Sequence, residues 1–184
     1  MSAKQMNPKT LRRKNKNKII FFPGGKEANK GICYMNDKKI VIKTDASAWK
    51  DSKTGKVLRA GWAFVVYDMK GNELCYQQHK LYPNEEPEEL TEIRCEMMAF
   101  IAALIWLKKN DQYQAVLKSD SRTMVNGILG IAKRKANYDL WDEMELEVRK
   151  AINQIEDICY IPREENSRAD QLANQAANAI FLAA

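Results

Sequence analysis

The order in which two hydrophobic periodicities follow one another is the strongest constraint on the fold. A β-branched segment predicts a strand at residues 40–45, and further strands are predicted at 61–67 and 74–81. The run Asp-Met-Lys-Gly-Asn at 68–72 predicts a turn between the second and third strands. These segments therefore predict an antiparallel meander at the start of the folded region.

After this meander, helical and strand patterns alternate. Helices are predicted at 91–108, 121–131, 140–154 and 169–182, and strands at 115–119 and 158–161. Strands that are joined through helices usually lie parallel. The order βββ-α-β-α-α-β-α predicts a mixed α/β fold. Its five-stranded sheet has three antiparallel strands followed by parallel ones, with helices on its faces.

The first 35 residues show no lasting periodicity and carry the chain's excess positive charge. Of the 30 Lys and Arg and 24 Asp and Glu in the chain, residues 1–30 hold nine and one, so the remainder has a net charge of −2. We therefore expect a basic arm, 1–35, and a folded domain, 36–184. A basic run can bind phosphate or serve as a solubilising or targeting tail. The arm residues expected to bind nucleic acid are Arg12, Arg13 and Lys14.

Composition excludes several other classes of protein. No stretch reaches the roughly 20 apolar residues of a membrane span, and no apolar segment of a secretory signal follows the basic N-terminus. The cysteines are too far apart in sequence for a CxxC metal or redox motif. They are Cys33, Cys75, Cys95 and Cys159. We expect an intracellular, cytoplasmic or nucleoid-associated protein that is not secreted and binds no membrane.

One acid stands at the head of an apolar helical stripe. Glu96 begins it, and the apolar residues that follow at helical spacing are Ala99, Phe100 and Ala103. A carboxylate on the face packed against a sheet is costly unless its charge is compensated. Glu96 therefore reaches water, pairs with a cation such as Arg94, or belongs to a functional site.

Three further acids stand at predicted element ends. Asp45 closes the first strand, where a turn with Ser47 is the simple alternative to function. Asp120 lies between a strand and a helix, where an N-cap role would explain it. Asp170 opens the last helix and forms a capping-box pattern with Ser167.

As a set, these acids indicate a metal site. If the first and fourth strands are parallel neighbours, Asp45, Glu96, Asp120 and Asp170 converge at one rim of the sheet. Carboxylates at close range repel one another, so such a cluster is favourable only around cations. Oxygen ligands without paired His or Cys favour Mg²⁺ or Mn²⁺. Two such ions are suited to phosphodiester hydrolysis.

The ordered motifs around these acids resemble the ribonuclease H type 1 family. They are Thr44-Asp45-Ala46-Ser47, Arg94-Cys95-Glu96-Met97-Met98-Ala99, Ser119-Asp120-Ser121 and Glu165-Asn166-Ser167-Arg168-Ala169-Asp170-Gln171-Leu172-Ala173. The segment Asn137-Tyr138-Asp139-Leu140-Trp141 is similar to the one before that family's fourth helix. The resemblance covers about residues 39–182.

The resemblance implies an RNase H-like fold and endonucleolytic hydrolysis of the RNA strand of an RNA/DNA hybrid. Asp45, Glu96, Asp120 and Asp170 would be the catalytic residues and the ligands of two Mg²⁺ ions, with Mn²⁺ as a substitute. Glu96 would also lie near the RNA 2′-hydroxyl. The residues expected to bind the hybrid are Ser47, Arg94, Arg122, Lys133, Arg134 and Lys135. The protein is expected to act as a monomer.

Several positions depart from the family pattern. Ala46 replaces the usual Gly. Glu92 and Ile93 replace two amide side chains, and Arg122 stands where Gln is common. These changes leave open a related nuclease activity on branched DNA or double-stranded RNA, and also a binding module without activity.

The loop before the last acid lacks the His that many members use for product release. The only His of the chain, His79, falls in the third predicted strand, where we expect a structural role. Arg163 or Glu165 would take over the release function. The basic handle of some bacterial members is reduced to residues 133–135, so we expect the N-terminal arm to supply the missing electrostatic grip.

Overall fold

The structure is a computed structural model that describes residues 38–86 and 88–179. Its strands are β1 (Lys39–Lys50), β2 (Val57–Asp68), β3 (Glu73–Leu81), β4 (Gln114–Ser119) and β5 (Ile155–Tyr160). Its helices are α1 (Glu92–Lys109), α2 (Arg122–Ile128), α3 (Tyr138–Ala151) and α4 (Ser167–Asn178), and a 3-10 turn, η2 (Arg163–Glu165), precedes α4. The predicted arm, with Arg12, Arg13 and Lys14, lies outside the described residues.

The strands form one mixed sheet in the order β3-β2-β1-β4-β5. β2 pairs antiparallel with both β1 and β3, whereas β4 is parallel to β1 and β5 is parallel to β4. The predicted fold class is confirmed. The register aligns Thr44 with Ser119, so the first residues of the two motifs that contain Asp45 and Asp120 lie side by side at the centre of the sheet.

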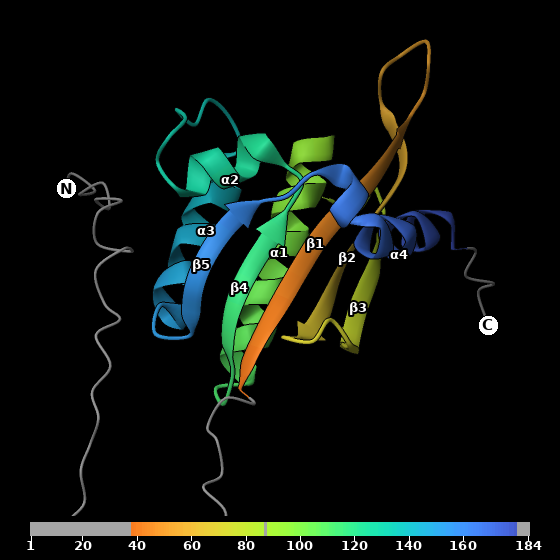
Figure 1. Cartoon of the computed structure of the whole chain (residues 1–184). Coiled ribbons are helices and arrows are strands. Elements are labelled where there is room, and N and C mark those ends of the chain that lie inside the picture. Colours follow the sequence, from red (N-terminus) through yellow and green to blue (C-terminus); the bar gives the residue numbers. More distant parts are fainter. Residues whose placement is uncertain (1–37, 87, 180–184) are drawn as a thin grey trace, which may run out of the picture.

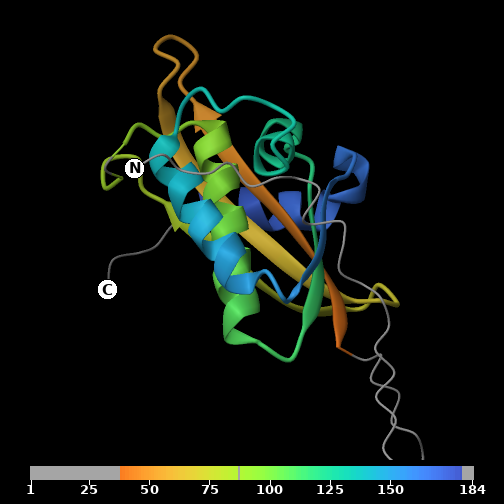
Figure 2. The ribbon, with the colours of Figure 1, turned by 90° about the vertical axis from the view of Figure 1, so that its left-hand side faces the viewer.

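Helices cover both faces of the sheet unequally (Figures 1 and 2). α1 and α3 pack over one face and enclose the main core, which includes Ile42, Phe64, Phe100, Leu104 and Leu117. α4 alone packs on the other face, where its apolar side contacts β1, β2 and β3. Because α4 covers only part of that face, the rest of the sheet surface stays accessible.

The first hairpin is longer than the sequence predicts. β1 continues past Asp45 to Lys50, and β2 begins at Val57 rather than at Gly61. The hairpin therefore projects beyond the body of the molecule (Figure 1). Asp45 lies within a strand, so the expectation that it ends the strand is wrong. Pairing with β2 holds the polar segment extended although its residues resemble a loop.

A buried arginine connects the start of α1 to the start of α3. Arg94 is 4% exposed, and its guanidinium donates to both carboxylate oxygens of Asp139, at 3.0 and 2.7 Å. It also donates to the side chain of Asn137, which precedes α3 in a left-handed conformation with φ 59°. Bidentate geometry of this kind fixes the relative position of two helices.

Among the described residues, no helix is both long enough and apolar enough to cross a membrane.

Candidate active site

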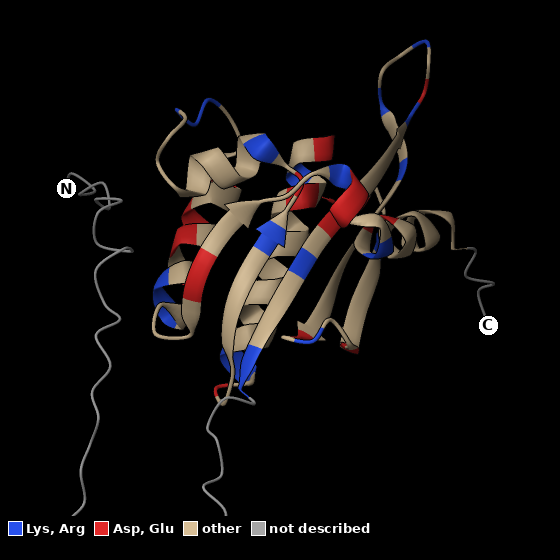
Figure 3. Cartoon of the chain, in the orientation of Figure 1, with Lys and Arg blue, Asp and Glu red and all other residues tan. Residues whose placement is uncertain are grey.

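The fold brings together the elements that carry the four acids. Asp45 lies in β1, and Asp120 directly follows the neighbouring parallel strand β4. Glu96 lies in the second turn of α1 and Asp170 in the first turn of α4. Figure 3 shows acidic positions on upper β1 and on the first turns of α1, at the same end of the sheet. All four carboxylates contribute to one local electric field, because Asp120, Asp170 and Glu96 each raise the pKa of Asp45.

Asp45 is the most strongly perturbed member of this acid cluster, which we define as Asp45, Glu96, Asp120 and Asp170. Burial, followed by the charge of Asp120, raises the pKa of Asp45 to about 8. Its Oδ1 accepts a hydrogen bond from the Ala46 N–H at 2.7 Å, whereas its buried Oδ2 has no hydrogen-bond partner among the described residues. The alternative of a turn with Ser47 is wrong, since the Ser47 hydroxyl donates to Asn174 of α4 at 2.8 Å.

Glu96 is partly buried and receives no ion pair in the described structure. Burial raises its pKa to about 7, with further contributions from Glu92 and Asp120, while a hydrogen bond with the Ser121 side chain opposes the shift. The suggested pairing with Arg94 does not form, because that guanidinium is bound to Asp139. Glu96 thus keeps an uncompensated carboxylate beside the other acids.

Asn166 organises the cluster, a role that the sequence analysis missed. Its fully buried amide Nδ2 donates to Asp120 Oδ1 at 2.8 Å and to the Thr44 carbonyl at 3.0 Å. The backbone carbonyl of Asn166 accepts a hydrogen bond from the Asp170 N–H at 3.1 Å. Asn166 therefore contacts three of the acid-bearing segments. In the sequence, Asn166 stands within the last motif, but nothing beside it indicates which groups its side chain binds.

The capping alternatives for Asp120 and Asp170 are also wrong. α2 begins at Arg122 with Ser121 at its N-cap position, so Asp120 precedes the cap. α4 begins at Ser167, and Asn166 occupies its N-cap position. Asp170 instead accepts a hydrogen bond from Arg163 at 3.0 Å, in a pair whose side chains are 77% and 31% exposed.

The donor chemistry of the cluster fits divalent cations. All four side chains offer carboxylate oxygens, and one oxygen of Asp45 is buried without a partner among the described residues. Burial, and then repulsion by neighbouring acids, raises the pKa values of Asp45 and Glu96. Mg²⁺ and Mn²⁺ prefer such ligands. Within residues 38–86 and 88–179, no three His, Cys, Asp or Glu side chains already stand in a metal-binding group.

Some of the residues that were expected to bind nucleic acid are exposed, whereas Arg134 is held by contacts within the protein. Arg122 stacks over the Tyr160 ring at 4.6 Å, and Lys133 and Lys135 are exposed in the loop before α3. Arg134 is engaged instead, because it pairs with Glu145 and lies over the Trp141 ring.

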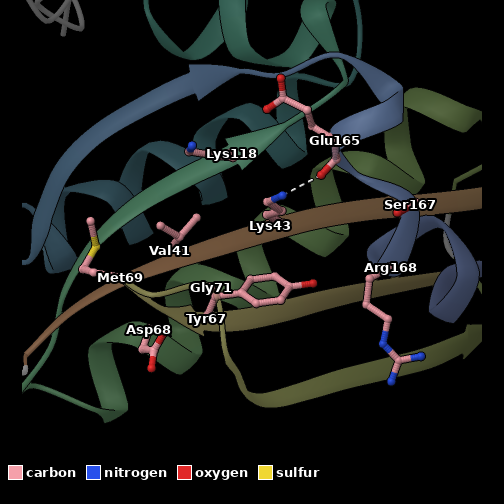
Figure 4. Close-up of a pocket in the computed structure, with 10 residues that line it drawn as sticks. All are labelled: Val41, Lys43, Tyr67, Asp68, Met69, Gly71, Lys118, Glu165, Ser167 and Arg168. Carbon is pink, nitrogen blue, oxygen red and sulfur yellow. Dashed lines mark hydrogen bonds between the residues drawn. The ribbon is translucent and has the colours of Figure 1, made fainter.

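A shallow pocket of about 280 Å³ adjoins the cluster on the α4 side of the sheet (Figure 4). Lys43 and Lys118 line it, and Lys43 donates to the Glu165 carbonyl at 2.5 Å, which secures η2 against β1. None of the four clustered acids lines this pocket. The pocket is therefore separate from the acid cluster, and its lining combines Lys43, Lys118 and Arg168 with Asp68 and Glu165.

Similarity to solved structures supports the same fold. LC11-RNase H1, isolated from compost by a metagenomic approach, is 28% identical over 77% of this chain and 96% of that one, with a TM-score of 0.64. Its complex with an RNA/DNA hybrid matches at 27% identity, over 76% and 96% of the two chains and with the same TM-score of 0.64. The N-terminal RNase H domain of a Mycobacterium tuberculosis protein is 24% identical over 76% and 94%, with a TM-score of 0.61.

The family model described as reverse transcriptase-like matches residues 43–176, a span that contains all four acids. No curated protein sequence matches significantly. The family match covers most of the chain, and the RNase H1 structures share its mixed sheet and helices. The chain therefore belongs to the reverse transcriptase-like family and has the RNase H-like fold.

Proposed function

We propose that the protein is an endoribonuclease that hydrolyses the RNA strand of RNA/DNA hybrids with two divalent metal ions. The observation that carries this proposal is the acid cluster, which four separate elements build at one end of the sheet. The fold that builds it is shared with LC11-RNase H1, whose structure was solved with an RNA/DNA hybrid.

Asp45, Glu96, Asp120 and Asp170 would hold the ions, either Mg²⁺ or Mn²⁺. When bound, the ions would supply Lewis-acid activation of water and stabilisation of charge on the leaving oxygen. The side chains have the complementary task of presenting fixed oxygens. Asn166 holds Asp120 in place, and the backbone N–H of Ala46 orients Asp45. Glu96 also lies at the α1 edge of the cluster, where it would contact the RNA 2′-hydroxyl.

Arg163 is the residue best placed to assist product release. Its exposed guanidinium already binds a carboxylate of the cluster, Asp170, and the charges of Asp45 and Asp120 help to raise its pKa. A cleaved phosphate is an equally good partner for a guanidinium. Arg163 would therefore exchange Asp170 for the product and draw it away. Glu165 is the weaker candidate, because its carboxylate would repel the phosphate of the product.

Contacts to the hybrid are assigned to exposed groups near the cluster. Arg122, Lys133 and Lys135 are available for phosphate, and Ser47 lies on the same strand as Asp45. Arg94 is reassigned to a structural role, because its buried guanidinium is held by Asp139. We further propose a catalytic domain at 36–184, a phosphate-binding arm at 1–35, and action as a monomer inside the cell.

A second candidate is another nuclease activity of the same fold, on branched DNA or double-stranded RNA. Glu92, Ile93 and Arg122 occupy positions where hybrid-reading side chains are expected, and Arg122 projects from the start of α2 beside Asp120. Because these residues differ from the pattern, a substrate other than a hybrid would meet different side chains in the groove.

The test is cleavage of an end-labelled RNA/DNA hybrid by the full chain in Mg²⁺, with parallel single-stranded RNA, RNA duplex, DNA duplex and branched DNA. Hybrid-only cutting that EDTA and Asp120→Asn abolish is the expected result. Asp142→Asn is the matched control, since it makes the same change at an exposed position of α3. Failure of folded protein to cut the hybrid in either Mg²⁺ or Mn²⁺ would sink the proposal, and cutting of branched DNA instead would establish the second candidate.

A further inference from the structure

The projecting β1–β2 hairpin carries a group of cations that the proposed chemistry does not use. We call Trp49, Lys50, Lys53, Lys56 and Arg59 the hairpin tip; all five side chains are exposed. Figure 3 shows basic positions along this projection. Since the sequence alone predicts a loop for these residues, their arrangement becomes visible only in the structure.

The charge of the hairpin tip is not neutralised locally. Asp51 is the one acid between residues 46 and 60, and its Oδ1 accepts hydrogen bonds from Lys53 N–H, Thr54 N–H and the Thr54 hydroxyl at 3.0, 2.7 and 2.9 Å. These bonds close the turn rather than bind a side-chain cation. Among the described residues, no ion pair includes a cation of the hairpin tip. Four positive groups are thus available to an external anion.

Two tip residues also form a flat positively charged surface. The Arg59 guanidinium lies over the Trp49 ring, 4.6 Å from its centroid, and the two residues face each other across the hairpin. Trp49 remains 47% exposed. An aromatic ring beside a guanidinium suits the sugars and phosphates of nucleic acid. A protein partner would instead require a larger apolar centre.

Within the hairpin tip, Trp49 lies on the same face of β1 as Asp45. Alternate residues of a strand share a face, so Asp45, Ser47 and Trp49 point the same way. Four residues of strand span about 13 Å, or roughly four steps along a nucleic-acid strand. A duplex whose scissile phosphate lies at Asp45 therefore continues over the tip.

We propose that the hairpin tip is a second nucleic-acid contact, which binds the backbone of the substrate duplex about four base pairs from the acid cluster. The choice of an RNA/DNA hybrid as that duplex rests on the proposed function. The tip recognises phosphate and sugar, so it adds affinity and position without reading sequence.

The test is binding of a fluorescein-labelled hybrid of about 18 base pairs to the full chain in EDTA, followed by anisotropy at several salt concentrations. Lys53→Ala/Lys56→Ala should raise Kd about 5–10-fold and reduce the slope of log K against log salt by about 1–2. Lys108→Ala/Lys109→Ala is the matched control, because it removes the same charge at the far end of α1. This control should keep the Kd of the unmodified protein within about twofold.

A separate variant tests the stacked surface. Trp49→Ala should weaken hybrid binding about 5-fold while the salt slope stays nearly unchanged, because contact of an uncharged ring with the sugars releases few counterions. Unchanged Kd and slope in the double-lysine variant, or an equal loss in the control, would overturn the tip contact. These results do not depend on cleavage. If the tip variants bind the hybrid more weakly but the unmodified protein does not cut it, the proposed function is rejected and the tip contact stands.

Discussion

The side-chain amide of Asn166 donates a hydrogen bond to Asp120 Oδ1 across 2.8 Å, in a position where Asn166 is fully buried. The same nitrogen also binds the Thr44 carbonyl, next to Asp45. One amide therefore fixes the carboxylate that follows β4 relative to the strand that carries Asp45. Groups that orient ligands in this way commonly matter for metal affinity about as much as the ligands themselves.

We predict that Asn166→Asp raises the Mg²⁺ concentration needed for half-maximal activity by about 10-fold or more. The variant replaces the amide donor with a carboxylate oxygen that faces Asp120, so like charges repel where a hydrogen bond stood. Mg²⁺ titration of hybrid cleavage, with thermal unfolding in parallel, measures the effect. Asn178→Asp makes the same change at an exposed position of α4 and should leave the titration unchanged. A lower Tm with an unchanged Mg²⁺ midpoint would reduce Asn166 to a structural role.

We predict that Asp45→Asn stabilises the metal-free protein at alkaline pH. The pKa of Asp45 is raised to about 8 in the folded state, mainly by burial and then by Asp120. A folded-state pKa above the unfolded one means that stability is full below pH about 4 and is lost as the pH rises through about 8. Removing this charge should therefore increase the free energy of unfolding by about 2 kcal/mol near pH 8.5.

Urea unfolding in EDTA at several pH values measures this difference. The gap between Asp45→Asn and the unmodified protein should narrow as the pH falls towards about 4, where the carboxyl binds a proton in both states. Adding Mg²⁺ should stabilise the unmodified protein more than the variant, since bound ligand favours the folded state. A variant that is less stable at every pH would show that the Asp45 carboxylate is not under electrostatic strain.

We predict that Gly61→Ala costs both stability and activity. A Cβ at this position would lie 2.5 Å from the Ala177 backbone nitrogen and 2.8 Å from the Ala176 Cβ, so α4 must move away from β2. Overpacking of this kind typically lowers the free energy of unfolding by about 1–3 kcal/mol. Because α4 carries Asp170, the shift should also reduce kcat.

Gly71→Ala separates the two effects in this prediction. Its backbone has φ +87°, but nothing lies within 4 Å of an added Cβ. The control should therefore lose about 1 kcal/mol through backbone strain and keep its kcat. Equal kcat values for the two glycine variants, measured below their unfolding temperatures, would contradict the proposed link between α4 packing and the site.

The strands and helices could be predicted from the sequence because each one has a hydrophobic pattern within its own segment. Strands rich in β-branched residues, followed by a helix and a short buried strand, fix both the type and the order of the elements. In the structure, β1 pairs with β4 in parallel, which places the segments of Asp45 and Asp120 side by side. The sequence predicted convergence of the acids on the condition that the first and fourth strands are parallel neighbours, and this pairing is what the structure supplies.

Contacts between distant segments could not be predicted in the same way. Nothing near Arg94 in the sequence indicates that Asp139, 45 residues away, will hold its guanidinium. Similarly, residues 46–50 and 57–60 have the composition of a loop and form strands only through pairing across the hairpin. Asn166 was hidden for a related reason, since its partners lie 46 and 122 residues away.

The final prediction concerns residues 1–30, which hold nine of the chain's 30 Lys and Arg and one acid. Deleting them should raise the KM for the hybrid and flatten its salt dependence, because fewer counterions are released on binding. kcat should stay nearly constant, since the four acids and Asn166 all lie in the folded domain. Steady-state cleavage by the full and shortened chains, each at low and high salt, makes the measurement. An unchanged salt slope in the shortened protein would mean that phosphate contacts come from elsewhere, and the hairpin tip would then be the first place to look.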